Sequence, residues 1–153
     1  ELTGSETVYD LYCGTGTIGI FLAESAKEVI GIELVKSAVM NARENARLND
    51  ITNIQFFEGD LMTYFNNQDD INTLSNPDVL VIDPPRSGMH PRTVTDVMDM
   101  APDRIVYVSC NPSTQARDLQ LLCAEKYKLL RCRPVDMFPH TPHIENISVL
   151  VKS

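Results

Sequence analysis

Short apolar runs alternate with helical patterns along nearly the whole chain, and this alternation restricts the fold more than any other feature. Seven runs predict strands, at residues 8–12, 28–33, 54–58, 78–83, 104–109, 127–135 and 148–152. Between them, helical spacing of apolar residues predicts helices over 17–25, around 38–46, around 94–101 and after Asn111–Pro112. Such alternation is typical of an α/β fold with a doubly wound, mostly parallel sheet. The last two runs would complete the sheet as an antiparallel hairpin.

No feature of the sequence divides it into parts. The 153 residues contain no repeat, low-complexity tract or linker, so we expect one domain over residues 1–153. The runs 78–83 and 104–109 are apolar on consecutive residues, which is typical of strands covered on both faces, and the polar segment 66–76 is expected to be a loop. No apolar run approaches the roughly 20 residues of a membrane span. Because the chain starts at Glu1 without a methionine, we expect a fragment of a longer cytoplasmic enzyme.

Charge and cysteine content exclude some classes of partner. The net charge of −8 does not indicate a nucleic-acid partner, since binding to phosphates needs clustered Lys and Arg. Any RNA partner must therefore be bound by a local site or by parts of the protein outside this chain. The four cysteines (Cys13, Cys110, Cys123 and Cys132) form no C-x-x-C pair and no zinc spacing, which favours free thiols. Simple packing is expected for three of them.

The stretch DLYCGTGTIGI, residues 10–20, contains Gly14-x-Gly16-x-x-Gly19 directly after a predicted strand. Glycines at these positions let the backbone turn tightly and approach a ligand outside the carboxyl ends of the strands. Glu33 ends the second predicted strand and can accept hydrogen bonds from both hydroxyls of a ribose. These features suit NAD and S-adenosylmethionine equally, so by themselves they predict a nucleotide-containing cofactor without identifying it.

Two carboxylates favour S-adenosylmethionine over NAD. Asp10 lies on the first predicted strand, where it can hold water or the cationic amino group of the cofactor's amino-acid end. NAD would place its pyrophosphate there. Asp60 ends the third predicted strand and can accept a hydrogen bond from an adenine amino group. Each has an ordinary alternative, because Asp10 could cap a helix and Asp60 could be the N-cap before Leu61.

Three candidate catalytic side chains adjoin predicted strands in the second half of the chain. Asp83 ends one strand, Cys110 follows the next, and Glu145 precedes the last, which should run antiparallel to its neighbours. We therefore expect all three at the same edge of the sheet as the glycine loop. Cys110 also stands at a predicted helix start, where free N–H groups and the helix dipole favour a thiolate. Glu145 enters an apolar strand and suits a general base.

The ordinary alternatives for these residues are a packed cysteine at position 110 and a surface glutamate at position 145. His143-x-Glu145 could also be half of a metal site. The only other histidines are His90 and His140, so no ligand set is expected to assemble and we predict no metal.

Taken with these residues, the sequence resembles the S-adenosylmethionine-dependent RNA 5-methyluridine methyltransferases. One family pattern is Asp-Pro-Pro-Arg-x-Gly, then an apolar pair, Tyr-x-Ser-Cys-Asn and a Thr. It is met by Asp83 to Gly88, Ile105-Val106-Tyr107, Ser109-Cys110-Asn111 and Thr114. A second pattern, Asp-x-Phe-Pro-x-Thr-x-His-x-Glu, is met by Asp136, Phe138, Pro139, Thr141, His143 and Glu145. The resemblance covers essentially the whole chain, as the family's catalytic domain with its Rossmann-like fold.

The resemblance implies a role for each matching residue. Cys110 would be the nucleophile, Glu145 the base that removes the carbon-5 proton, and Asp83 the residue that holds the uracil edge near the cofactor. Tyr12, Thr17, Glu33 and Asp83 match family positions around S-adenosylmethionine. Two departures are Thr17, where many members have Asn, and His140, where Gln is common.

The family also implies parts that this chain does not contain. Its members usually carry N-terminal RNA-binding parts, some with an iron–sulfur cluster, so RNA would be bound through the full-length protein, expected to be a monomer. Three rivals stay open at this point. An amine methyltransferase would usually have an aromatic residue where Arg86 follows the Pro-Pro pair, and would leave Cys110 without a role. An NAD-dependent oxidoreductase gives no reason for Cys110 and Glu145, and an inactive module that only binds S-adenosylmethionine is the third.

Overall fold

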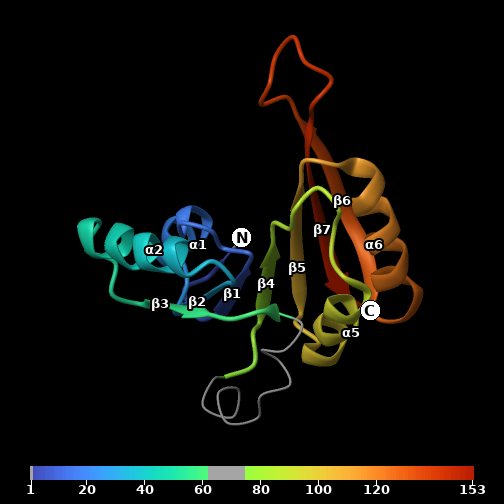
Figure 1. Ribbon diagram of the computed structural model, residues 1–153. Coiled ribbons are helices and arrows are strands. Elements are labelled where there is room, and N and C mark those ends of the chain that lie inside the picture. Colours follow the sequence, from blue (N-terminus) through green and yellow to red (C-terminus); the bar gives the residue numbers. More distant parts are fainter. Residues whose placement is uncertain (1, 62–74) are drawn as a thin grey trace. The chain divides into compact units, whose positions relative to one another are not determined.

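The computed structural model describes residues 2–61 and 75–153 (Figure 1). Along the chain the elements are β1 (Thr7–Leu11), α1 (Thr17–Ala23), β2 (Glu28–Glu33), α2 (Lys36–Leu48), β3 (Ile54–Glu58), β4 (Val79–Ile82), α5 (Pro91–Met100), β5 (Arg104–Ser109), α6 (Pro112–Glu125), β6 (Tyr127–Val135) and β7 (Glu145–Lys152). The strand order is β3-β2-β1-β4-β5-β7-β6. The expected doubly wound α/β fold with seven strands and a terminal antiparallel hairpin is confirmed. Most of the predicted loop 66–76 lies outside the described residues.

The chain forms two compact units, Glu1–Leu80 and Val81–Ser153. In the first unit β1 pairs with β2 and β2 with β3, both in parallel. β1 is buried at every position, and α1 and α2 pack against this sheet. A cluster made by Cys13, Val39, Ala42, Ala46 and Phe56 holds α2 to the strands. This core fixes the turn between β1 and α1, where the glycine motif lies.

In the second unit β7 pairs antiparallel with both β5 and β6. α6 packs against β5 and β6, and α5 lies beside α6 (Figure 1). α6 begins as expected at Asn111–Pro112, because the side chain of Asn111 accepts a hydrogen bond from the Ser113 N–H at 3.2 Å. β7 starts at Glu145, three residues earlier than the apolar run suggested, since Glu145 still pairs with Val135 of β6.

Two expectations about burial are wrong. The apolar residues of the predicted helix after Asn111–Pro112 are Ala116, Leu119, Leu122 and Cys123, but the buried residues of α6 are Gln115, Asp118 and Leu122. β5 is not covered evenly on both faces, because burial alternates along it, whereas β4 is buried throughout as predicted. Gln115 and Asp118 are buried because their side chains bond to residues of β5 and β7, so apolarity alone identified only Leu122 on the buried face.

The cysteine expectation is also partly wrong. Cys13 is buried as expected, but Cys123 and Cys132 are exposed, and all four cysteines are free thiols. Among the described residues, no helix is both long enough and apolar enough to cross a membrane.

Candidate active site

The glycine motif forms a tight turn between β1 and α1 in the first unit. Gly14 and Gly16 have φ angles of +54° and +83°, which side-chain-bearing residues rarely adopt. A Cβ at Gly16 would lie 2.6 Å from the ring of Phe56, whereas a Cβ at Gly14 would meet nothing within 4 Å. Tyr12 also has a positive φ of 61° without being glycine. Protein atoms therefore fill the space beside Gly16, whereas the space beside Gly14 is empty.

Two carboxylates brace this turn. Glu33, at the end of β2, accepts hydrogen bonds from the N–H of Gly14 at 3.0 Å and of Val35 at 2.9 Å. Asp10 is fully buried on β1 and accepts a hydrogen bond from the Gly19 N–H in the first turn of α1 at 2.8 Å. Asp10 thus makes the helix-terminal contact that was its ordinary alternative. The Glu33 carboxylate is half-buried and has further lone pairs for a ligand.

The remaining predicted cofactor residues of this unit are exposed. Thr17 opens α1, and Asp60 stands directly before Leu61. Cys13, in contrast, is buried inside the turn, and this burial raises the pKa of its thiol to about 12, with the carboxylates of Asp10 and Glu33 adding to the effect. Cys13 therefore stays a neutral, packed thiol and is no candidate nucleophile.

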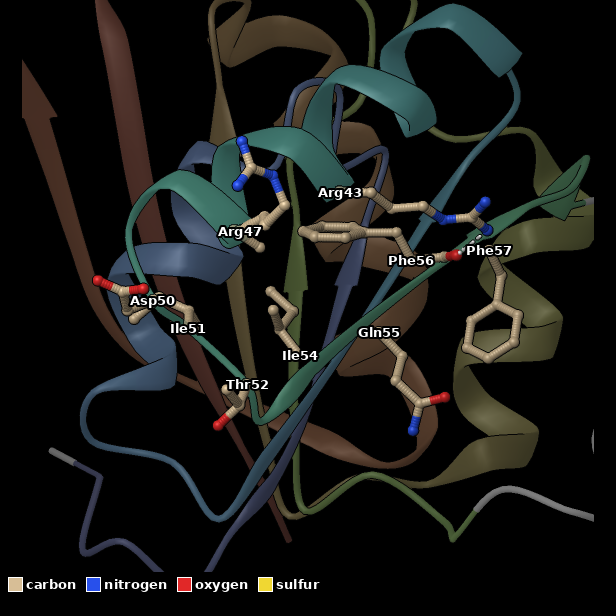
Figure 2. A pocket seen from close by; sticks show the side chains of 10 residues that line it. Arg43, Arg47, Asp50, Ile51, Thr52, Ile54, Gln55, Phe56 and Phe57 are labelled. Atoms are coloured by element: carbon tan, nitrogen blue, oxygen red, sulfur yellow. Dashed lines mark hydrogen bonds between the residues drawn. The ribbon is translucent and has the colours of Figure 1, made fainter.

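A pocket of about 550 Å³ in the first unit contains none of the predicted site residues (Figure 2). The end of α2, β3 and the segment between them line it. Its two arginines already have partners, since Arg43 donates to the carbonyl of Phe56 at 2.6 Å and Arg47 bonds to Glu44 at 2.7 Å. The other polar side chains that line it are Asp50, Thr52 and Gln55.

In the second unit, the pairing of β5 with β7 brings the predicted nucleophile beside the predicted base. The last pair in this antiparallel register joins Ser109 to Asn146. Cys110 directly follows Ser109, and Glu145 directly precedes Asn146, so both residues lie at this end of the β5–β7 pairing. Both side chains are half-buried.

The charge of Glu145 affects the pKa of Asp83. Its pKa is raised from the ordinary value of 3.8, first because the surrounding protein removes water from the carboxylate and second because the Glu145 carboxylate repels its charge. The side chain still reaches solvent, so the loss of water is partial. Asp83 is therefore close enough to Glu145 for their charges to interact, at the end of the β5–β7 pairing that Cys110 follows.

The segment that follows Asp83 is clamped by α6. The carbonyl of Arg86 accepts hydrogen bonds from the side chains of Asn111 at 3.0 Å and Thr114 at 3.1 Å. Arg117 donates to the carbonyl of Ser87 at 3.1 Å. Asp118, only 1% exposed, accepts from the Met89 N–H at 2.8 Å and from the Tyr107 hydroxyl at 2.6 Å. The helix that follows the nucleophile thus holds the loop that begins at Asp83.

Gly88 explains the last position of the Asp-Pro-Pro-Arg-x-Gly pattern. Its φ is +76°, and a Cβ there would lie 2.7 Å from both the Arg117 guanidinium and the Asp118 carboxylate. A side chain would push the loop away from α6, so only glycine fits.

The second sequence pattern, which starts at Asp136 and ends at Glu145, forms the connection between β6 and β7. Hydrogen bonds within this connection stabilise its turn. The Thr141 hydroxyl donates to the Phe138 carbonyl at 2.8 Å, and the Phe138 N–H donates to Asp136 at 3.2 Å. His140 occupies the turn with φ 68°. A guanidinium nitrogen of Arg86 lies 3.5 Å from Nδ1 of His143, which links this connection to the clamped loop.

Sequence reasoning missed the buried polar residues of the second unit. Gln115, Asp118, Asn146 and Ser148 are all buried. Their sequence spacing could have indicated the burial of Gln115 and Asp118, because both share one face of a helix with Leu122. Among residues 2–61 and 75–153, no group of three or more His, Cys, Asp or Glu side chains could hold a metal ion.

The chain is similar to known proteins over nearly its whole length. The family profile described as tRNA (uracil-5-)-methyltransferase matches residues 3–153. A Porphyromonas gingivalis protein named "uncharacterized RNA methyltransferase" is 54% identical over 153 residues, covering 99% of this chain and 33% of its own length. A protein of the same name from Bacteroides thetaiotaomicron is 54% identical over 149 residues, covering 97% of this chain and 32% of its own length. This chain therefore spans about a third of the length of these relatives.

Solved structures give the same result for the fold. The tRNA (uracil-54, C5)-methyltransferase of Pyrococcus abyssi, in complex with S-adenosyl-L-homocysteine, superposes with a TM-score of 0.84 at 37% identity. The match covers 98% of this chain and 35% of that one. A precorrin-6y C5,15-methyltransferase from Geobacter metallireducens, at 17% identity and a TM-score of 0.78, covers 100% of this chain and 82% of its own and shares the fold alone.

The raised pKa of Asp83 predicts that replacing this residue stabilises the protein at neutral pH. A carboxyl whose pKa is higher in the folded than in the unfolded state stabilises the fold below the ordinary value of 3.8, and this contribution is lost as the pH rises above it. Asp83→Asn should therefore unfold at higher urea concentration than the wild type at pH 7, by less than about 1 kcal/mol because the group reaches solvent.

The gain from Asp83→Asn should vanish below pH 3.8. Glu145→Gln serves as the matched control, since it removes only the weaker cause of the shift and should give a smaller gain. A wild type more stable than Asp83→Asn at pH 7 would contradict this reading of the site.

Proposed function

The chain belongs to the tRNA (uracil-5-)-methyltransferase family, and on this premise we propose that, within the full-length protein, it transfers a methyl group from S-adenosylmethionine to carbon 5 of a uridine in transfer or ribosomal RNA. The family match over residues 3–153 confirms the resemblance that the two sequence patterns indicated. The observation that supports the proposed reaction best is the β5–β7 register, in which Ser109, the residue before Cys110, pairs with Asn146, the residue after Glu145. Ordinary oxygen or nitrogen methylation needs no such pair.

The first unit fits the proposed cofactor. The open space at Gly14 leaves room for a ligand against the backbone, and the carboxylate of Glu33 is held at the end of β2 by two N–H groups. A carboxylate at this position suits the two hydroxyls of a ribose. We assign cofactor binding to Asp10, Tyr12, Gly14, Gly16, Thr17, Glu33, Asp60 and Asp83. When bound, S-adenosylmethionine supplies an electrophilic methyl group on a positively charged sulfur.

The second unit supplies the groups that activate uracil. Carbon 5 of uracil is a weak nucleophile, so the base must first gain electron density. In the proposed mechanism, the Cys110 thiolate forms a bond to carbon 6, and the electron pair of the carbon 5–carbon 6 double bond moves toward the carbonyl at carbon 4 as an enolate. This enolate makes carbon 5 nucleophilic. Asp83 holds the edge of the uracil ring.

Glu145 completes the reaction after carbon 5 has gained its methyl group. Its carboxylate takes the proton from carbon 5, and the released electron pair re-forms the double bond to carbon 6. The bond from carbon 6 to the Cys110 sulfur breaks, so the thiolate leaves with its electrons and is ready for another uridine. Glu145 then returns its proton to water.

The proposed partner is RNA, bound by the full-length protein as a monomer in the cytoplasm. A net charge of −8 disfavours phosphate binding by this chain alone, so the target strand would be held mainly by other parts of the protein. The uridine must leave its base stack to reach Cys110.

Glu33→Ala should weaken binding of S-adenosylhomocysteine, because a charged acceptor for the ribose hydroxyls is lost. The expected loss is about 1.5–3 kcal/mol, or about 10- to 150-fold in Kd, measured by titration calorimetry. Glu58→Ala is the matched control, since Glu58 ends β3 in register with Glu33 and is exposed. Equal Kd values for the two variants would move the ribose away from Glu33.

Cys110→Ala and Glu145→Gln should fail at different steps when the full-length protein acts on unmodified transfer and ribosomal RNA transcripts. Cys110→Ala should form neither 5-methyluridine nor a covalent complex. Glu145→Gln should still add the methyl group but release the RNA about 10²–10⁴-fold more slowly. Its covalent complex should appear as a retarded band on a denaturing gel.

Cys123→Ala and Glu125→Gln are matched controls, since both residues are exposed and lie on α6. Both should behave as the wild type, with 5-methyluridine identified by mass spectrometry. Normal turnover by Glu145→Gln, or a covalent band with Cys110→Ala, would refute the assigned roles. A wild type that binds S-adenosylmethionine but never methylates RNA would instead indicate an inactive binding module.

A further inference from the structure

Gln115 and Asn146 form a buried pair of amides in the second unit. Gln115 is 1% exposed and Asn146 is 8% exposed. The side-chain nitrogen of Gln115 donates to the carbonyls of Tyr107 at 2.9 Å and Asn146 at 3.1 Å. The side-chain oxygen of Gln115 accepts a hydrogen bond from the side-chain nitrogen of Asn146. One glutamine thus joins α6 to β5 and β7 at once.

The pair adjoins, along the chain, both residues assigned to the chemistry. The backbone N–H of Gln115 donates to the carbonyl of Asn111 at 3.1 Å, in the first turn of the helix that follows Cys110. Asn146 is the residue after Glu145 and pairs with Ser109, the residue before Cys110. Any shift of β7 against the start of α6 would break these bonds.

Both polar atoms of the Gln115 side chain have hydrogen-bond partners, which makes the contact directional. Its amide has two N–H donors, each of which has a carbonyl, and its oxygen has the Asn146 donor. Two leucines of similar size would fill the same space without fixing the direction of either strand. A satisfied buried network defines a single arrangement of its elements, and a half-satisfied one is costly.

Cys110 has other supports that do not involve Gln115. Asn111 and Thr114 bond to the Arg86 carbonyl, and the Ser109 hydroxyl accepts from the Asn111 N–H at 3.0 Å. Glu145, in contrast, is the first residue of β7 and follows the exposed connection 136–144. Its pairing with Val135 holds it to β6, so its position relative to Cys110 depends on Asn146, which pairs with Ser109 of β5 and bonds to Gln115.

We propose that Gln115 is a positioning residue that, through Asn146, holds Glu145 at the carbon-5 proton, and so controls release of the methylated uridine more than attack by Cys110. The inference rests on the proposed function. Loss of the pair should leave thiolate attack and methylation close to normal. Proton removal and expulsion of the thiolate should become slow, so the covalent complex should persist.

The test follows two isotopes in one reaction of the full-length protein. The probe is total RNA labelled with [5-³H]uridine, taken from cells that lack the enzyme, together with [methyl-¹⁴C]S-adenosylmethionine. Each methyl group that becomes bound must eventually displace one tritium from carbon 5. In the wild type, ¹⁴C incorporation and ³H release should rise together. In Gln115→Leu, ³H release should lag ¹⁴C incorporation, with a covalent complex that lives about tenfold longer or more, given the sensitivity of catalysis to small displacements.

Two further variants separate positioning from loss of stability. Leu122→Ala removes a buried side chain from the same face of α6 and should lower Tm without any lag between the isotopes. Gln115→Asn should show the lag, because its amide is one methylene too short. The exchange Gln115→Asn with Asn146→Gln keeps the combined length of the two side chains and should restore the wild-type ratio.

Each outcome decides the matter. A lag in Leu122→Ala equal to that in Gln115→Leu, no lag in Gln115→Leu, or no rescue by the exchange would each overturn the positioning role. A wild type that takes up ¹⁴C and releases ³H in step keeps the proposed function intact in all these cases. If the wild type releases no ³H, the proposed function itself is wrong, and the positioning role is wrong with it.

Discussion

The antiparallel pairing of β5 with β7 is the constraint on which the chemistry of the second unit depends. A parallel β7 would place its first residue at the far end of β5 from Cys110. In the antiparallel register, Ser109 pairs with Asn146, so the proposed nucleophile follows β5 at the end where the proposed base begins β7. Six residue pairs fix the register. Near the Ser109–Asn146 end, the Gln115 side chain donates hydrogen bonds to a carbonyl of each strand. Cys110 and Glu145, 35 positions apart in sequence, are thereby brought to the same end of the strand pair.

The conformation of the loop after Asp83 depends on the N-terminal part of α6. The first turns of α6 supply side chains that hold the carbonyls and N–H groups of residues 86–89, and Gly88 is the position where α6 comes too close for a Cβ. The two halves of the first sequence pattern are therefore bonded to each other. This explains why Asn111 and Thr114 belong to the pattern although neither has an assigned role in bond making.

Much of this arrangement could be predicted from the sequence. The strand–helix alternation gave the fold, and the family match over residues 3–153 agrees with the motifs. The helix start at Asn111–Pro112 follows from local chemistry alone, since a capping side chain and a residue without an N–H define it. The site residues themselves remain assignments from sequence pattern and family resemblance.

Other features could not be predicted, because they depend on what a side chain meets in the folded protein. Gln115 and Asp118 are polar, so periodicity placed them toward solvent, yet strand carbonyls and the Met89 N–H make their burial favourable. Cys132 lies within a predicted strand but is exposed. Asp10 was considered as a contact for a ligand, and its bond to Gly19 shows that it also secures α1.

The central claim is that Cys110 forms a covalent bond to the uracil ring during methyl transfer. RNA transcribed with 5-fluorouridine tests it directly, because fluorine at carbon 5 cannot be removed as a proton and the enzyme–RNA complex should be trapped after methylation. The full-length wild-type protein should be incubated with this RNA and S-adenosylmethionine, then digested with protease and nuclease for mass spectrometry. The account predicts a single modified peptide in which Cys110 carries a methylated 5-fluorouridine nucleotide. A nucleotide on any other residue, or methylation of ordinary RNA without a trapped complex on the fluorinated RNA, would contradict it.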